Sequence, residues 1–178
     1  PTANETILWR ALCSEDSPIA GLDCQYDISS MEGVSLMVIR GGVATGRLLG
    51  GNLAVLAGML GTPFEIETVG RILFLEDVSE RLYRIDRYLS QLRLAGKLNS
   101  LSGVLLGSFS YDDGDQAEKQ SDVAALMTEF FSPLGVPVLA GFPAGHERIN
   151  VTLPIGGLIK LDADAGRVTR LEASVLRH

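Results

Sequence analysis

Two side chains of this sequence have the chemistry of an acid–base pair. His146, in the loop GFPAGHERIN, is the only interior histidine, because the other, His178, is the last residue. Glu76 ends the short apolar run ILFLE. A glutamate can fix the tautomer of an imidazole and stabilise its protonated form, while the imidazole takes a proton from a nucleophile. If these two side chains meet, they can supply the base and the acid of a catalytic triad.

Each residue alone also has an ordinary structural explanation. Acidic residues directly after a buried strand, such as Glu76 and Asp77, are common in solvated loops, and Asp77 or Ser79 could cap the next helix. A histidine between Gly145 and Glu147 is often merely exposed. A zinc site is disfavoured, because one interior histidine without nearby cysteines or an HExxH motif leaves too few ligands. The sequence therefore predicts no metal and no other cofactor.

No residue has the local sequence of a catalytic nucleophile. Ser108 follows the apolar run in LLGSFS, but the segment lacks the GxSxG turn. Cys13 and Cys24 have neither CxxC nor metal-ligand spacing, and we expect two reduced thiols without a catalytic role. The glycine-rich segment GGVATGRLLGGN matches neither a Walker A motif nor GxGxxG. We interpret its glycines as tight backbone turns before a helix that Asn52 could cap.

The elements that must position Glu76 and His146 alternate between strands and helices. Apolar runs predict strands within 24–46 and at 72–75, 102–110 and 136–143. Helical spacing predicts helices over 2–16, 53–60, 81–94 and 115–135, and the segment 151–174 is predicted to form a β-hairpin with its turn at 162–166. This order indicates an α/β fold with a mixed sheet. Functional residues of such sheets gather beyond the C-terminal ends of the strands, which places Glu76 and His146 in one cleft.

Length and charge restrict the class of protein. A chain of 178 residues with 46% hydrophobic content can bury one core, so one domain is expected. The net charge of −7 disfavours nucleic acid and anionic membranes as partners, since both select basic surfaces. No apolar run reaches the roughly 18–20 residues that span a bilayer. The N-terminus shows no signal peptide, but it also begins without a methionine, as a processed protein or an excised fragment would.

Three strings of the sequence, in order, resemble a known family. They are TGRLLGGNLAVLAGMLGTPFEIETVGRILFLEDVSERLYRIDRYLSQLRLAG, GVLLGSFS and GVPVLAGFPAGHERINVTLPIGGLIKLDA. Together they resemble the C-terminal domain of LD-carboxypeptidases, the muramoyltetrapeptide carboxypeptidases, from about Thr45 to Asp164. The microcin C self-immunity peptidases are close relatives of that family.

The resemblance implies a serine peptidase with a Ser–His–Glu triad. Such enzymes release the terminal D-alanine of murein tetrapeptides during cytoplasmic cell-wall recycling. The glutamate of the family motif LED corresponds to Glu76, and the histidine of the loop P-x-GH corresponds to His146. The implied fold is a swivelling β/β/α type of domain, and members of the family are commonly homodimers.

The nucleophile of the family has no counterpart in this sequence. In LD-carboxypeptidases the serine lies in a separate N-terminal domain, in a string like GYSDIT that is absent here. We therefore expect residues 45–178 to form the C-terminal domain, with 1–44 as a crossover helix and short strands leading from a missing nucleophile domain. One continuous domain over 1–178 is the alternative. The isolated chain is expected to lack activity.

Three other functions stay open from the sequence. A microcin-type peptidase of the same family would cut a peptide–nucleotide conjugate, and aromatic residues that stack on a base would favour it. A non-catalytic binding or assembly module could retain the fold. A general acid–base enzyme that uses only Glu76 and Asp77 is disfavoured, because adjacent residues of a strand point to opposite faces.

Overall fold

The computed structural model describes residues 8, 25–27, 33–110, 116–146 and 148–172. The strands are β1 (Gln25–Asp27), β2 (Met37–Arg40), β3 (Val43–Asn52), β4 (Ile72–Val78), β5 (Gly103–Ser110), β6 (Val138–Ala140), β7 (Leu158–Asp162) and β8 (Arg167–Arg170). The helices are α2 (Leu53–Gly58), α3 (Leu82–Leu94) and α4 (Gln116–Phe131), which the 3-10 turn η1 (Ser132–Leu134) extends.

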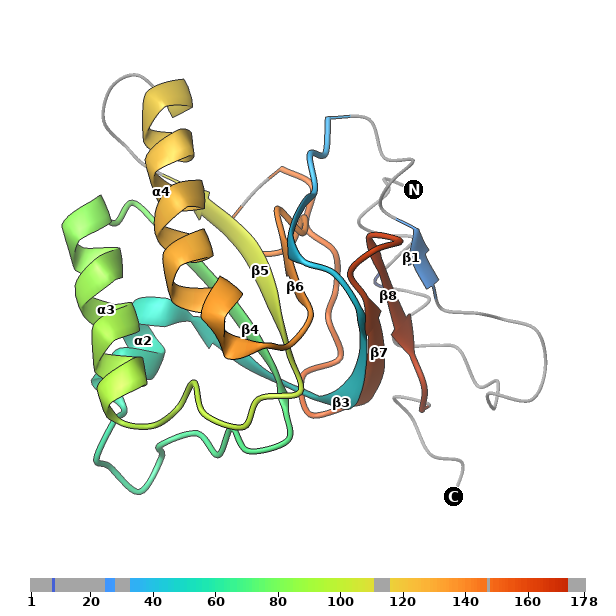
Figure 1. Ribbon diagram of the computed structural model, residues 1–178, viewed down its shortest axis with the longest axis horizontal. Coiled ribbons are helices and arrows are strands. Elements are labelled where there is room, and N and C mark those ends of the chain that lie inside the picture. Colours follow the sequence, from blue (N-terminus) through green and yellow to red (C-terminus); the bar gives the residue numbers. More distant parts are fainter. Residues whose placement is uncertain (1–7, 9–24, 28–32, 111–115, 147, 173–178) are drawn as a thin grey trace.

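The strands form one mixed sheet in the order β1-β8-β7-β3-β4-β5-β6-β2. Strands β3 to β6 are parallel, while β2 and the strands β7, β8 and β1 add antiparallel pairs at the two sides. The ten-residue strand β3 pairs with β7 over Val43–Arg47 and with β4 over Leu48–Asn52. It therefore belongs to both the antiparallel and the parallel part. Figure 1 shows the three helices together at one side and the hairpin β7–β8 at the other.

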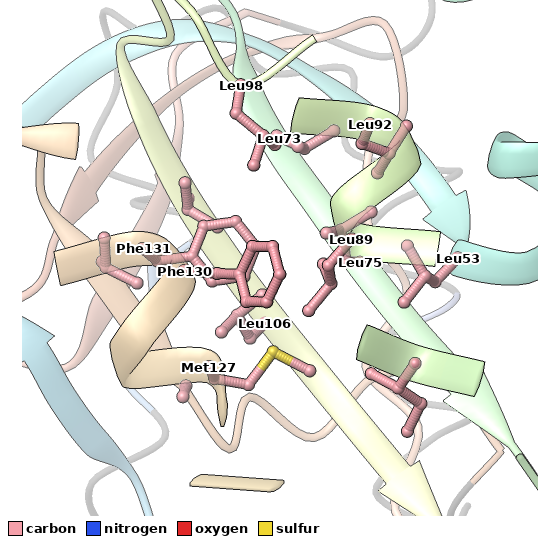
Figure 2. Close-up of a cluster of buried hydrophobic side chains, with 14 of the residues drawn as sticks. Leu53, Leu73, Leu75, Leu89, Leu92, Leu98, Leu106, Met127, Phe130 and Phe131 are labelled. Carbon is pink, nitrogen blue, oxygen red and sulfur yellow. The ribbon is translucent and has the colours of Figure 1, made fainter. Parts of the chain in front are cut away.

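The first core lies between the parallel strands and the helices. Leu73 and Leu75 of β4 are fully buried and pack with Leu89 and Leu92 of α3. Phe131 of α4 is also fully buried, and Figure 2 shows it in the same cluster. Burying side chains of this size contributes about 1.5–3 kcal/mol each, so this apolar layer fixes α3 and α4 against one face of the sheet.

The second core lies on the opposite face of the sheet. It contains Ile72 and Phe74 of β4, Phe142 of the loop after β6, and Ile159 and Leu161 of β7. Because the side chains of a strand alternate between its faces, β4 sends even-numbered residues to this core and odd-numbered residues to the helices. The loop that carries His146 and the hairpin β7–β8 therefore cover the face toward which Glu76 points.

The fold confirms the expected α/β class with a mixed sheet and a C-terminal hairpin, in which Asp162 pairs with Arg167. Of the expected helix over 2–16, the structure describes only Leu8, which is helical, and the rest lies outside the described residues. The glycine-rich segment is different from the expectation, because residues 43–52 form strand β3 rather than a series of turns. Hydrogen bonding to β4 and β7 keeps it extended. Asn52 does cap α2, since its Oδ1 accepts from Val55 N at 3.1 Å.

Among the described residues, no helix has the length and apolarity to cross a membrane.

An ion pair between two loops makes a prediction about acid stability. Lys97 Nζ lies 2.5 Å from Glu65 Oε1, and the amide of Gly61 donates to the same carboxylate. The hydrogen bond from Lys97, followed by that from Gly61, holds the pKa of Glu65 below its usual value of 4.5. A lowered folded-state pKa stabilises the fold above the unfolded value, and this stabilisation is lost as pH falls through the folded pKa.

We expect Glu65→Gln to lower stability at pH 7 and to flatten the loss of stability below about pH 4.5. Urea midpoints between pH 3 and pH 7 measure both effects. Lys97→Met removes the other partner of the pair and should change the profile in the same direction. If the stability of both variants falls with decreasing pH as steeply as that of the unmodified chain, the Lys97–Glu65 ion pair is not the cause of the acid sensitivity.

Candidate active site

The structure brings Glu76 and His146 together. His146 Nδ1 lies 2.8 Å from Glu76 Oε2. Because an ionised carboxylate can only accept, the neutral ring carries its proton on Nδ1 and donates it to Glu76. This tautomer leaves Nε2 free to accept a proton. The glutamate is 5% exposed, whereas the histidine side chain is 53% exposed. The pair is therefore a buried acid behind a solvent-facing base.

Strand alternation gives Glu76 its direction. Ile72 and Phe74 precede it on the same face and belong to the second core, so the Glu76 side chain points toward the loop after β6. Glu76 pairs with Asn52 of β3 on one side and faces β5 on the other. The carboxylate is thus held by a central strand of the sheet, which is a rigid support.

Backbone hydrogen bonds fix the loop that carries His146 along β5. Phe142 N donates to Leu106 O at 3.0 Å, and Ser108 N donates to Ala144 O at 3.1 Å. These bonds continue the pairing of β5 beyond the end of β6. The fully buried ring of Phe142 anchors the same segment in the second core.

The next turn of this loop places His146 itself. Gly145 N donates to Asn150 Oδ1 at 3.3 Å, and Val151 N donates to Pro143 O at 2.7 Å, which closes the loop across the histidine. Gly145 has φ +129°, and a Cβ there would lie 2.6 Å from Ser108 Oγ and 2.9 Å from Glu76 Oε2. Only glycine satisfies both the backbone angle and the space. A glycine at position 145 is therefore required for the contact between Glu76 and His146.

Asp77 has a separate, structural role. Its carboxylate accepts from Asn52 Nδ2 at 2.9 Å, from Ala54 N at 3.0 Å and from Val78 N at 2.9 Å. It therefore anchors the N-terminus of α2 to β4. The expected cap of α3 by Asp77 or Ser79 is not formed, because Arg81 occupies that position without a side-chain hydrogen bond. Sequence reasoning missed the Asn52–Asp77 contact, which depends on the pairing of β3 with β4.

Ser108 does not act as the partner of His146. Its Oγ is buried and has no hydrogen-bond partner, so it is not bonded to the imidazole and is closed to a substrate. Cys13 and Cys24 lie outside the described residues. In the part of the chain that the structure describes, no group of three His, Cys, Asp or Glu residues could hold a metal ion. Among the described residues, the geometry therefore provides a base and an acid, and Ser108 is not bonded to the imidazole as a nucleophile would be.

Comparison with known proteins finds similar sequences over most of the chain. The family profile of the LD-carboxypeptidase C-terminal domain matches residues 45–161. A "Probable murein peptide carboxypeptidase" of Bacillus subtilis is 39% identical over 134 residues, which are 75% of this chain and 42% of that protein. The murein tetrapeptide carboxypeptidase of Pseudomonas aeruginosa is 32% identical over 155 residues, covering 86% and 48%. The chain thus spans less than half the length of these two relatives.

Solved structures show the same architecture. A crystal structure of muramoyltetrapeptide carboxypeptidase from Oxalobacter formigenes has a TM-score of 0.71 at 32% identity, and the match covers 94% of this chain and 54% of that one. The structure of MccF in complex with glutamyl sulfamoyl guanosine has a TM-score of 0.69 at 28% identity, covering 80% and 42%.

Proposed function

Because the chain belongs to the LD-carboxypeptidase family, whose C-terminal domain matches residues 45–161, we propose that it carries the base and the acid of a serine carboxypeptidase. In this proposal the whole protein hydrolyses the bond to the terminal D-alanine of murein tetrapeptides. Two similar proteins are named murein tetrapeptide carboxypeptidase and muramoyltetrapeptide carboxypeptidase, which supports a tetrapeptide substrate. The observation that carries the proposal is the 2.8 Å contact between His146 Nδ1 and Glu76 Oε2. It leaves a free Nε2 on an exposed ring.

The mechanism assigns one proton path to His146. Nε2 takes the proton of a serine hydroxyl as that oxygen attacks the carbonyl carbon before D-alanine. The imidazolium then gives this proton to the amine of D-alanine as the peptide bond breaks, which leaves an acyl-enzyme. Water attacks the ester while Nε2 takes its proton, and the imidazolium then gives this proton to the serine oxygen as the ester bond breaks, which restores both residues. The negative charge of Glu76 stabilises the imidazolium in both halves of the reaction.

The serine is assigned to an N-terminal domain outside these 178 residues. Residues 1–44 are proposed as the crossover from that domain, and 45–178 as the C-terminal domain. From the crossover, β1 pairs with β8 and β2 pairs with β6, so these two strands join the same sheet. The exposure of His146 supports this division, since an incoming domain would cover the ring. We further propose that the protein acts in the cytoplasm as a homodimer in cell-wall recycling.

A second substrate class has specific support. The microcin C7 self-immunity protein MccF of Escherichia coli is 31% identical over 132 residues, which are 74% of this chain and 38% of that protein. The relative bound to glutamyl sulfamoyl guanosine shares the fold. The alternative function is therefore hydrolysis of an acidic aminoacyl sulfamoyl nucleoside by the same residues.

One comparison of substrates tests these proposals. We expect the full-length protein, expressed with the coding sequence upstream of residue 1, to release D-alanine from murein tetrapeptide. We expect the 178 residues alone to release none, because the serine is missing. D-alanine is measured with D-amino acid oxidase, and glutamyl sulfamoyl adenosine is offered in parallel. Turnover of only the nucleoside would favour the microcin-type function, and turnover by the isolated chain would overturn the assignment of the serine.

A further inference from the structure

Strand β5 contains an extra residue opposite Glu76. Leu75 pairs with Leu106 and Asp77 pairs with Phe109, so a single residue of β4 faces both Gly107 and Ser108. This is a β-bulge, which is rare between parallel strands and typically redirects a side chain next to a functional site. Gly107 has no side chain to offer. The bulge therefore brings only one side chain, that of Ser108, beside the acid of the pair.

The hydroxyl of Ser108 lacks a partner although it is buried. Its Oγ has no hydrogen bond in the structure, whereas buried polar atoms are bonded in the large majority of cases. Ser108 Oγ and Glu76 Oε2 both lie within 3 Å of one point, the Cβ position of Gly145, at 2.6 Å and 2.9 Å. An unused donor and a buried carboxylate thus flank the same glycine.

We propose that Ser108 is a positioning residue whose hydroxyl donates to the Glu76 carboxylate and holds it against His146. A rotation about the Cα–Cβ bond of Ser108 re-aims its hydroxyl, and a charged acceptor makes the stronger hydrogen bond. The bond gives Glu76 a second fixed contact beside the imidazole. Its effect on catalysis rests on the function proposed above, whereas the contact itself does not.

A double-mutant cycle in this chain tests the contact without any assay of activity. Ser108→Ala removes the donor, and Glu76→Gln removes the charge of the acceptor with little change of shape. If the two groups are bonded, Ser108→Ala should lower the folding equilibrium constant about tenfold more in the unmodified chain than in the Glu76→Gln background. Urea unfolding followed by circular dichroism gives these constants and shows whether each variant folds cooperatively.

Ser102→Ala is the matched control. It is the same chemical change just before the opposite end of β5, where Ser102 N donates to Arg71 O through the backbone alone. We expect its cost to be the same with and without Glu76→Gln. If Ser108→Ala lowers the folding equilibrium constant by the same factor with and without Glu76→Gln, the contact is absent and the proposal is wrong.

Kinetics of the full-length protein test the positioning role. Ser108→Ala should lower kcat about three- to tenfold with KM unchanged, because the substrate does not touch the hydroxyl. Ser102→Ala should change neither constant. If the double-mutant cycle shows coupling but Ser108→Ala leaves kcat unchanged, the positioning role is wrong. If the double-mutant cycle shows coupling but the unmodified full-length protein cleaves neither murein tetrapeptide nor glutamyl sulfamoyl adenosine, the Ser108–Glu76 contact stands and the proposed function is wrong.

Discussion

Replacing His146 by alanine in the full-length protein is expected to lower kcat for D-alanine release by about 10⁴- to 10⁶-fold. In the proposed mechanism the ring takes the serine proton, through the Nε2 left free by the bond to Glu76. Glu76→Gln should cost about 10⁴-fold, because an amide cannot stabilise the imidazolium and can favour the wrong tautomer. Both constants are measured with excess substrate, so that loss of binding is not mistaken for loss of chemistry.

The fold should survive the histidine replacement. The His146 side chain is 53% exposed, so its removal leaves no cavity in the core. Loss of the ring leaves the buried Glu76 carboxylate without this hydrogen bond, so the free energy of unfolding of His146→Ala should fall by about 1–3 kcal/mol while unfolding stays cooperative. His178→Ala, which removes the other histidine of the sequence, is the matched control and should keep full activity. If His146→Ala retains more than about a tenth of kcat, His146 is not the base.

Gly50→Ala is expected to unfold most of the protein. A Cβ at this position of β3 would lie 1.9 Å from the carbonyl oxygen of Phe74, which is backbone of the neighbouring strand and cannot move aside. The φ angle of +136° adds strain for any other residue. We expect a loss of about 4 kcal/mol or more, comparable to the whole stability of many domains. Circular dichroism and urea unfolding measure it.

Gly51→Ala separates the two causes. Gly51 has a similar φ of +154°, but a Cβ there would meet no atom within 4 Å. Its replacement should cost only the backbone strain, about 1–3 kcal/mol. The difference between the two losses in free energy of unfolding measures the effect of the close approach of β3 to β4. Equal losses would mean that strain alone, and not contact with Phe74, makes Gly50 necessary.

Strand ends were the part of the site that sequence could predict. Glu76 follows an apolar run and His146 follows another, and parallel strands bring such positions to one edge of a sheet. The hairpin was also readable, from alternation around a turn. These features depend on neighbouring residues along the chain, and neither needs the register between distant strands.

The features that sequence could not predict depend on that register. The segment 43–52 contains three glycines and was interpreted as turns, yet pairing with β4 and β7 makes it the longest described strand. Asp77 was considered as a cap for the following helix, but it binds the N-terminus of α2, 23 residues earlier in the chain. The bulge that turns Ser108 toward Glu76 is visible only once β4 and β5 are aligned.

The double pairing of β3 also connects the hairpin β7–β8 to the strand position beside Glu76. One end of this strand pairs with Asp162 beside the hairpin turn, and the other end pairs Asn52 with Glu76. Local opening of a structure spreads through units that share hydrogen bonds, so fraying of the hairpin would reach the acid through a single continuous strand. A substitution near Asp162 could therefore reduce turnover without contacting the substrate, by increasing the fraction of time in which Glu76 is out of place.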